Sequence, residues 1–102
     1  YQQAGLQKTV PLTDVLFFAV EDKYVRMQLA EQNILLDKSL NQLETDYPQL
    51  LRIHRQTLIN PAHLSAIRQP ATGPALAELM QGQYKLPISR RALSAVKHAL
   101  QI

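Results

Sequence analysis

The sequence predicts one domain of mostly β structure, with a short internal helix and a second helix at the C-terminal end. Three observations support this fold class. Apolar and polar residues alternate with a period of two through several short runs, as in half-buried strands. Turn-forming residues separate these runs, and only two segments carry apolar residues at helical spacing. The 102 residues suit one domain with one modest core, and no linker or repeat divides them.

The first elements that we expect are two strands joined as a hairpin. Residues 14–20, DVLFFAV, form an apolar and aromatic run. In residues 23–29, KYVRMQL, polar and apolar side chains alternate. Glu21 and Asp22 stand where a tight turn would join the two strands. The pattern predicts a hairpin with one dry face.

A short strand and a short helix follow this hairpin. Residues 33–36, NILL, continue the sheet. Asp37 is suited to cap a helix that the next proline closes. Leu40, Leu43 and Tyr47 share one side of this helix. We therefore expect it to lie as a lid on a sheet.

The next predicted strand, residues 50–60, is unusual because it carries several cations. Leu51 and Ile53 alternate with Arg52 and His54 in LLRIHRQTLIN. Successive side chains of a strand point to opposite faces, so the cations should lie on the side away from the core.

A second hairpin is predicted after a turn and one more strand. Residues 60–63, NPAH, suit the turn and residues 64–67, LSAI, the strand. The hairpin pairs residues 75–80, ALAELM, with residues 83–88, QYKLPI. Gly82 can take a positive φ in the two-residue turn between them.

The chain ends in a predicted helix over residues 89–100, SRRALSAVKHAL. Ser89 is a good N-cap. Apolar residues recur behind it at helical spacing: Leu93, Val96 and Leu100. Arg90 and Arg91 would lie at the positive end of the helix dipole, where each exposed cation costs about 0.3–1 kcal/mol. Together with the free N–H groups they suit a phosphate, unless both arginines pair with acids of the first half.

Charge is distributed unevenly along the chain. Residues 1–51 hold four Lys or Arg against seven Asp or Glu, a balance of −3, whereas residues 52–102 hold seven against the single Glu78, a balance of +6. Any one of these cations can be a solvated surface residue. Their excess in the second half nevertheless indicates a surface for an anionic partner.

Several kinds of chemistry lack the residues they require. Without cysteine there is no disulfide, thiol nucleophile or thiolate metal site, which is compatible with a reducing cytosol. No G-x-S-x-G or phosphate-loop motif occurs. His54, His63 and His98 have no metal-ligand spacing. We expect no enzyme, metal or cofactor, and keep a phosphodiesterase that uses His54 as an alternative.

Targeting signals are also lacking. No apolar run approaches the roughly 18 residues of a membrane span, and no signal peptide opens the chain. We expect a soluble cytoplasmic protein without a membrane partner. Because the sequence starts at Tyr1 rather than methionine, we expect it to be part of a longer protein.

Four segments of the chain carry motifs that occur together in one known family. They read PLTDVLFFAVEDKYVRM, KSLNQLETDYP, LLRIHRQTLIN and YKLPISRRALSAVKHAL. The most specific parts are R-I-H-R followed by L-I-N, and L-P-I-S-R-R at the entry to the last helix, behind a D-K-Y-V hairpin. Over roughly residues 10–100 the chain resembles the LytTR DNA-binding domain, the output module of many bacterial response regulators.

The resemblance implies an elongated, mostly β fold of antiparallel sheets whose loops enter successive major grooves on one face of duplex DNA. It implies sequence-specific binding to double-stranded DNA by a bacterial transcriptional regulator, of which this domain is the C-terminal output part. It further implies a homodimer on direct repeats, an attached receiver domain and an upstream sensor kinase that acts through a phosphorelay.

The resemblance also assigns roles to individual residues. Four match positions that reach base edges: Lys23, Tyr24, Arg55 and Arg90. Four others are candidates for phosphate contacts, which set register: Arg52, His54, Ser89 and Arg91. Arginine suits base reading because its fork donates two hydrogen bonds to guanine O6 and N7.

Two departures from the family pattern shift the expected specificity toward the two reading arginines. Gln56 replaces the small hydroxyl residue that often follows the H-R pair, and the first loop has no histidine or asparagine.

RNA binding by a small basic β domain is the other alternative function. Single-stranded recognition uses aromatic stacking platforms, whereas Phe17 and Phe18 lie in an apolar run suited to a core.

Overall fold

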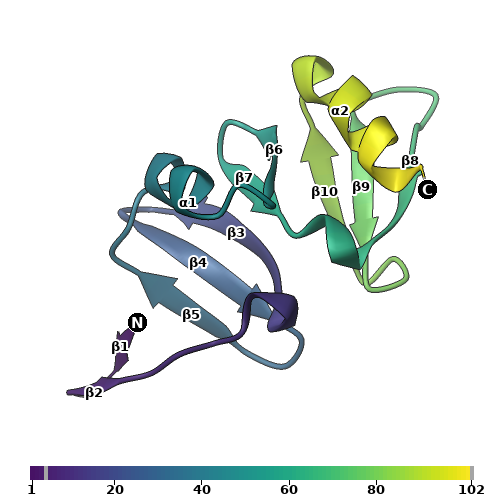
Figure 1. The fold of residues 1–102 in the computed structure, drawn as a ribbon. Helices are drawn as coiled ribbons and strands as arrows, with labels where there is room; N and C mark the ends of the chain where they lie inside the picture. The colour runs from purple at the N-terminus through teal and green to yellow at the C-terminus, as the bar shows by residue number, and fades with distance from the viewer. Residues whose placement is uncertain (4, 102) are drawn as a thin grey trace.

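The computed structural model describes residues 1–3 and 5–101 and is mostly β, as predicted. Two antiparallel sheets follow one another, each with one helix against it, in an elongated molecule of 47 × 23 × 22 Å (Figure 1). A ribbon of β1 (Gln2–Gln3) and β2 (Leu6–Gln7) precedes them. None of the helices in the described residues is long and apolar enough to cross a membrane.

The first sheet has five strands in the order β5-β4-β3-β7-β6. Their bounds are β3 (Val15–Glu21), β4 (Tyr24–Leu29), β5 (Asn33–Leu36), β6 (Leu51–His54) and β7 (Thr57–Ile59). The β3–β4 hairpin is confirmed, but its turn is one residue later than predicted. Glu21 still pairs with Tyr24, so the turn consists of Asp22, with a left-handed φ of 55°, and Lys23.

The internal helix α1 (Leu40–Asp46) packs against β3 and β7, as the predicted lid does. Its N-cap is Ser39, whose hydroxyl accepts a hydrogen bond from the Gln42 amide at 3.1 Å. The prediction of Asp37 as the cap was wrong, because that residue lies in the bend before the extended cap position. Tyr47 follows the last helical turn and is 38% exposed, so it does not extend the buried side.

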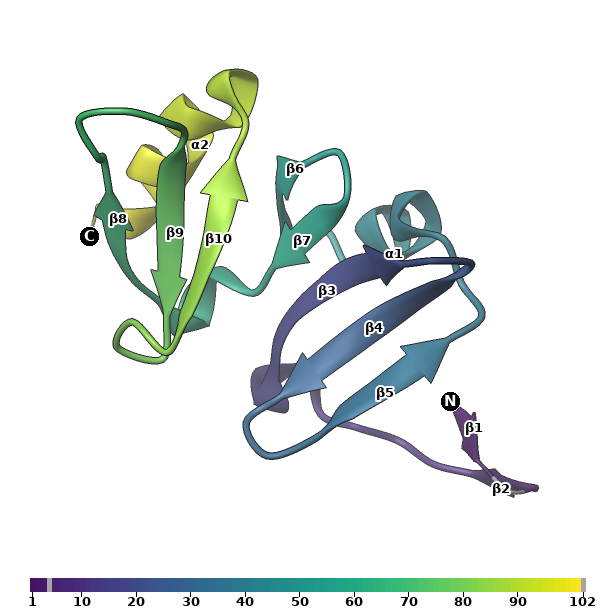
Figure 2. The ribbon, with the colours of Figure 1, turned by 180° about the vertical axis from the view of Figure 1, so that it is seen from behind.

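The second sheet has three strands, in the order β10-β9-β8. They are β8 (Leu64–Arg68), β9 (Ala75–Leu79) and β10 (Tyr84–Ile88), and α2 (Arg90–Leu100) covers them (Figure 2). Two single-turn helices, η1 (Leu12–Asp14) and η2 (Pro61–His63), lie in the connections that lead into β3 and β8.

The β9–β10 connection is longer than the predicted two-residue turn. Leu79 pairs with Tyr84, which leaves four residues, 80–83, in the loop. Gly82 has the expected positive φ of 91°, but Met80 and Gln81 precede it with φ of 51° and 56°. Three successive left-handed residues reverse the chain over a longer path than a two-residue turn.

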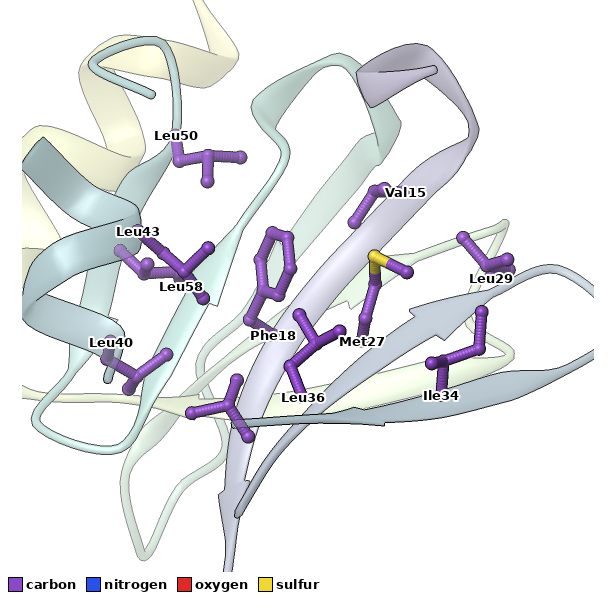
Figure 3. Close-up of a cluster of buried hydrophobic side chains, with 11 residues drawn as sticks. Val15, Phe18, Met27, Leu29, Ile34, Leu36, Leu40, Leu43, Leu50 and Leu58 are labelled. Atoms are coloured by element: carbon purple, nitrogen blue, oxygen red, sulfur yellow. The ribbon is translucent and has the colours of Figure 1, made fainter. Parts of the chain in front are cut away.

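Two buried clusters form the core, one on each face of β3. The first lies between the sheet and α1 (Figure 3): Val15, Phe18, Val25, Met27, Leu29, Ile34, Leu36, Leu40, Leu43, Leu50 and Leu58. The second lies between the two sheets and α2: Leu16, Phe17, Ile53, Ile59, Ala77, Leu79, Ile88 and Val96. The expectation of one dry face was therefore wrong for β3, because the second sheet and α2 bury its other face.

The two sheets are joined by an aromatic contact. The rings of Phe17 in β3 and Tyr84 in β10 meet edge to face, with centroids 5.4 Å apart. Such a pair contributes about 0.5–1.5 kcal/mol beyond the area it buries. The guanidinium carbon of Arg26 lies 5.8 Å from the Phe17 ring centroid. The Phe17–Tyr84 contact helps to fix the first sheet against the second, whereas Arg26 and Phe17 both belong to the first sheet.

Candidate nucleic-acid interface

The β6–β7 turn presents Arg55 at its tip. The prediction of one strand over residues 50–60 was wrong, because the chain reverses there: His54 pairs with Thr57, so Arg55 and Gln56 form a turn, and both are exposed. Ile53 is the extra residue of a bulge in β6 and is fully buried in the second cluster. Within the described ranges, 1–3 and 5–101, no carboxylate pairs with Arg55. Its guanidinium group is therefore available to a ligand.

The Arg52 side chain holds the β6–β7 turn through hydrogen bonds to its backbone. Its Nε donates to the His54 carbonyl at 2.8 Å, and its Nη2 donates to the Arg55 carbonyl at 2.5 Å. Its Nη1 contacts two residues of α1, the Glu44 carboxylate at 2.9 Å and the Asn41 side-chain oxygen at 3.2 Å. The Arg52 side chain is only 26% exposed.

This arrangement differs from the predicted solvent-facing phosphate contact of Arg52. In β6, Arg52 pairs with Leu58, whose side chain belongs to the first cluster under α1. The face that carries Arg52 is thus covered by a helix rather than by water. We refer to the hydrogen bonds of this guanidinium group with its four partners as the Arg52 brace. Nothing in the spacing of Arg52 and Glu44 indicated it, since the contact depends on where α1 packs.

His54 also takes part in the turn. Its ring Nδ1 accepts a hydrogen bond from the Gln56 amide at 3.3 Å. The side chain is half-buried, and its Nε2 has no protein partner among the residues that the structure describes. His54 can therefore hold the turn with one ring nitrogen and meet a ligand with the other.

The first turn of α2 lies beside the β6–β7 turn. The Ser89 amide donates to the Ile53 carbonyl at 2.8 Å, which ties the start of α2 to β6. Ser89 is the N-cap, as predicted, and its hydroxyl accepts from the Ala92 amide at 3.3 Å. Arg90 and Arg91 are exposed. The alternative in which they pair with acids of the first half is wrong for the part of the chain that the structure describes.

The β3–β4 turn continues the same edge of the first sheet. The Val20 amide donates to the Gln56 carbonyl at 3.0 Å, so the end of β3 lies against the β6–β7 turn. Lys23 is exposed beyond it, and Tyr24 is 45% exposed. We call the row formed by residues 22–24, 54–56 and 89–91 the basic edge.

The residues required by the rival functions do not assemble. His63 lies in η2, with its Nε2 2.7 Å from the Thr13 carbonyl, and η2 and His54 lie beyond opposite ends of β7. His98 is on the exposed side of α2. Among residues 1–3 and 5–101 no cluster of acids and histidines could hold a metal ion. Phe17 and Phe18 are 1% and 2% exposed and offer no stacking platform.

Comparisons with known proteins agree with the fold described above and identify a family. Residues 7–101 match the family model described as the LytTr DNA-binding domain. The positive alginate biosynthesis regulatory protein of Pseudomonas aeruginosa is 30% identical over 94 residues, which are 89% of this chain and 38% of that protein. The transcriptional regulatory protein BtsR of Escherichia coli is 45% identical over 62 residues, which are 61% of this chain and 25% of that protein.

A solved structure supports the fold independently. The LytTr DNA-binding domain of a putative methyl-accepting/DNA response regulator from Bacillus cereus matches with a TM-score of 0.77 at 24% identity, covering 91% of this chain and 86% of that chain. The chain therefore corresponds to one domain of its curated relatives and spans 38% or less of their length.

Proposed function

The chain belongs to the family of LytTR DNA-binding domains of transcriptional regulators, and we propose that it contacts double-stranded DNA through the basic edge. The hydrogen bond from the Ser89 amide to the Ile53 carbonyl carries this proposal. It brings together two arginine-bearing segments that are far apart in the sequence. Because the sheets are packed against each other, the two segments meet a duplex as one surface.

Arg55 and Arg90 are the proposed readers of base edges. Each extends from a fixed backbone position and has no acidic partner among the described residues. A guanidinium fork can donate two hydrogen bonds to guanine in the major groove. Lys23 in the β3–β4 turn and Tyr24 at the start of β4 would contact bases beside them. A turn and a helix end are narrow enough to enter a groove about 12 Å wide.

His54, Ser89 and Arg91 are the proposed phosphate contacts. The free Nε2 of His54, the cap region of α2 and a second guanidinium group flank the two readers. Phosphate contacts set register without reading sequence. We assign Arg52 to a different task, because its nitrogens already hold the turn that carries Arg55.

Binding-site selection on two variants tests these assignments. Arg55→Ala should lose about 1–3 kcal/mol on the selected site and relax the preference at one base position. Arg91→Ala should weaken selected and random duplexes alike and make the salt slope shallower by about one unit. Equal losses of Arg55→Ala on both duplexes would count against base reading by Arg55.

We propose further that two copies bind adjacent direct repeats, as the output part of a longer cytoplasmic response regulator with a receiver domain under a sensor kinase. The difference in length from the curated relatives supports a longer protein. Sedimentation of the domain with duplexes that carry one or two repeats tests the pairing. A second copy should bind more tightly next to the first, and independent binding of the two copies contradicts it.

A further inference from the structure

The exposed side of α2 carries a groove that extends beyond the proposed readers. Six residues line it, all from α2 or its end: Arg90, Leu93, Ser94, Lys97, His98 and Gln101. Every charged residue of α2 is basic. In the chain as described, residues 1–3 and 5–101, no carboxylate pairs with Arg90 or Lys97. The groove therefore suits an extended anion.

The polar residues of the groove form one stripe along the helix. Arg90, Ser94, Lys97 and Gln101 follow one another at intervals of four, three and four residues, which places them on one face. Ser94, Lys97 and Gln101 are exposed. Val96, which is fully buried in the second cluster, lies on the opposite face.

Lys97 lies within reach of the rim of a groove that Arg90 enters. A helix rises 1.5 Å per residue, so the Cα of Lys97 lies about 10 Å farther along the axis than that of Arg90, and the major groove is about 8.5 Å deep. When the Arg90 guanidinium meets a base at the floor, its own side chain spans most of that depth, so the rim phosphates stand level with the first turns of α2. Helical side chains lean toward the N-terminal end, so the Lys97 ammonium reaches back toward that rim.

We propose that this groove on α2 receives the sugar-phosphate backbone that borders the major groove entered by Arg90. Lys97 pairs with a phosphate, and Ser94 and Gln101 donate hydrogen bonds on either side of it. The inference rests on the proposed function, because it requires α2 to approach DNA with its N-terminal end. It assigns the exposed stripe of α2 a task that base reading does not cover.

Lys97→Gln is the direct test, and Lys85→Gln is the matched control. Lys85 is exposed on β10, with a side chain on the face opposite Tyr84 and Leu86, which pack on the second cluster. Fluorescence anisotropy over a salt series, with selected and random duplexes, measures Kd for each protein. Lys97→Gln should make the salt slope shallower by about 0.9 on both duplexes. If the proteins bind equally at 1 M salt, that slope gives a loss of about eightfold at 0.1 M.

Lys85→Gln should leave the slope unchanged, and Lys97→Arg should restore it. Circular dichroism must show the same helix content in every variant, which excludes a loss caused by fraying of α2. A wild-type slope in folded Lys97→Gln overturns the inference. Arg90→Ala separates this result from failure of the proposed function. If Arg90→Ala loses base preference while Lys97→Gln keeps its slope, only the assignment of the groove on α2 fails. If Arg90→Ala binds like the wild type, α2 does not enter the major groove of DNA, and both this inference and the role proposed for Arg90 fail.

Discussion

The two hairpin turns of the first sheet lie side by side on the basic edge but are built differently. The β6–β7 turn is held by side chains: Arg52 bonds to two of its carbonyls, and the His54 ring accepts from the Gln56 amide. No side-chain hydrogen bond holds the β3–β4 turn among the residues described in the structure. That turn instead relies on Asp22 in a left-handed conformation.

The two turns differ in charge as well. Residues 51–59, which form β6, the turn and β7, include Arg52, His54 and Arg55 and no acid, whereas Glu21 and Asp22 directly precede Lys23 at the β3–β4 turn. A phosphate-lined groove attracts the first turn and repels part of the second. The comparison teaches that the β6–β7 turn is pre-organised to hold Arg55, its proposed reader, in one position, whereas the β3–β4 turn has fewer contacts that fix its proposed DNA contact.

Removal of the Arg52 brace should have the largest effect. Arg52→Ala leaves two turn carbonyls and the Glu44 carboxylate without their partner. We expect the free energy of unfolding to fall by about 1–3 kcal/mol, and preference for the selected site to fall with it, because Arg55 loses its fixed position. Urea unfolding and anisotropy on selected and random duplexes measure the two effects.

Arg52→Lys distinguishes the brace from a phosphate contact. Lysine keeps the charge but cannot donate to two carbonyls and a carboxylate through a planar fork. The brace predicts that Arg52→Lys loses stability and base preference nearly as Arg52→Ala does. Full recovery of both by lysine would return Arg52 to the role of a phosphate-contacting cation.

Local sequence patterns were sufficient to predict most elements of the fold. Alternation identified β4 and β6, and the hydroxyl before two arginines identified the start of α2. The buried second face of β3 could not be predicted from Phe17 and Phe18, because a continuous apolar run does not tell which partner covers each side. That partner is the second sheet, which joins β3 only in the folded chain.

The candidate site was predictable where a backbone position alone defines it. Arg90 after an N-cap is exposed for a local reason. The turn that exposes Arg55 was not predicted, because the alternation through residues 50–60 indicated one continuous strand. Arg52 looked equivalent in the sequence, since it alternates with buried residues like any solvent-facing cation. Its environment depends on α1, whose Glu44 meets it across the packed face of the sheet. Contacts between elements of this kind leave no mark in the spacing of residues.

Loss of the His54 ring should have an intermediate effect. His54→Ala removes the acceptor of the Gln56 amide, a single neutral hydrogen bond at 3.3 Å. We expect the free energy of unfolding to fall by about 0.5–1.5 kcal/mol, and hydrogen exchange at the Gln56 amide to accelerate. Unchanged exchange at that amide would show that the ring does not hold the turn, and a shallower salt slope would then place His54 among the phosphate contacts alone.

The smallest effect is expected in the β3–β4 turn. Asp22→Asn keeps the size of the side chain, and asparagine tolerates the left-handed φ of 55°, so stability should be unchanged. Removal of the negative charge should strengthen binding by about 0.5 kcal/mol or less on selected and random duplexes alike, and the gain should disappear at high salt. Anisotropy at two salt concentrations measures this gain.

Glu31→Gln is the control, because Glu31 lies between β4 and β5, at the opposite end of β4. Weaker binding confined to the selected duplex would contradict simple repulsion, since a carboxylate can accept a hydrogen bond from cytosine N4. The β3–β4 turn would then read sequence as the β6–β7 turn does, despite its lack of a brace.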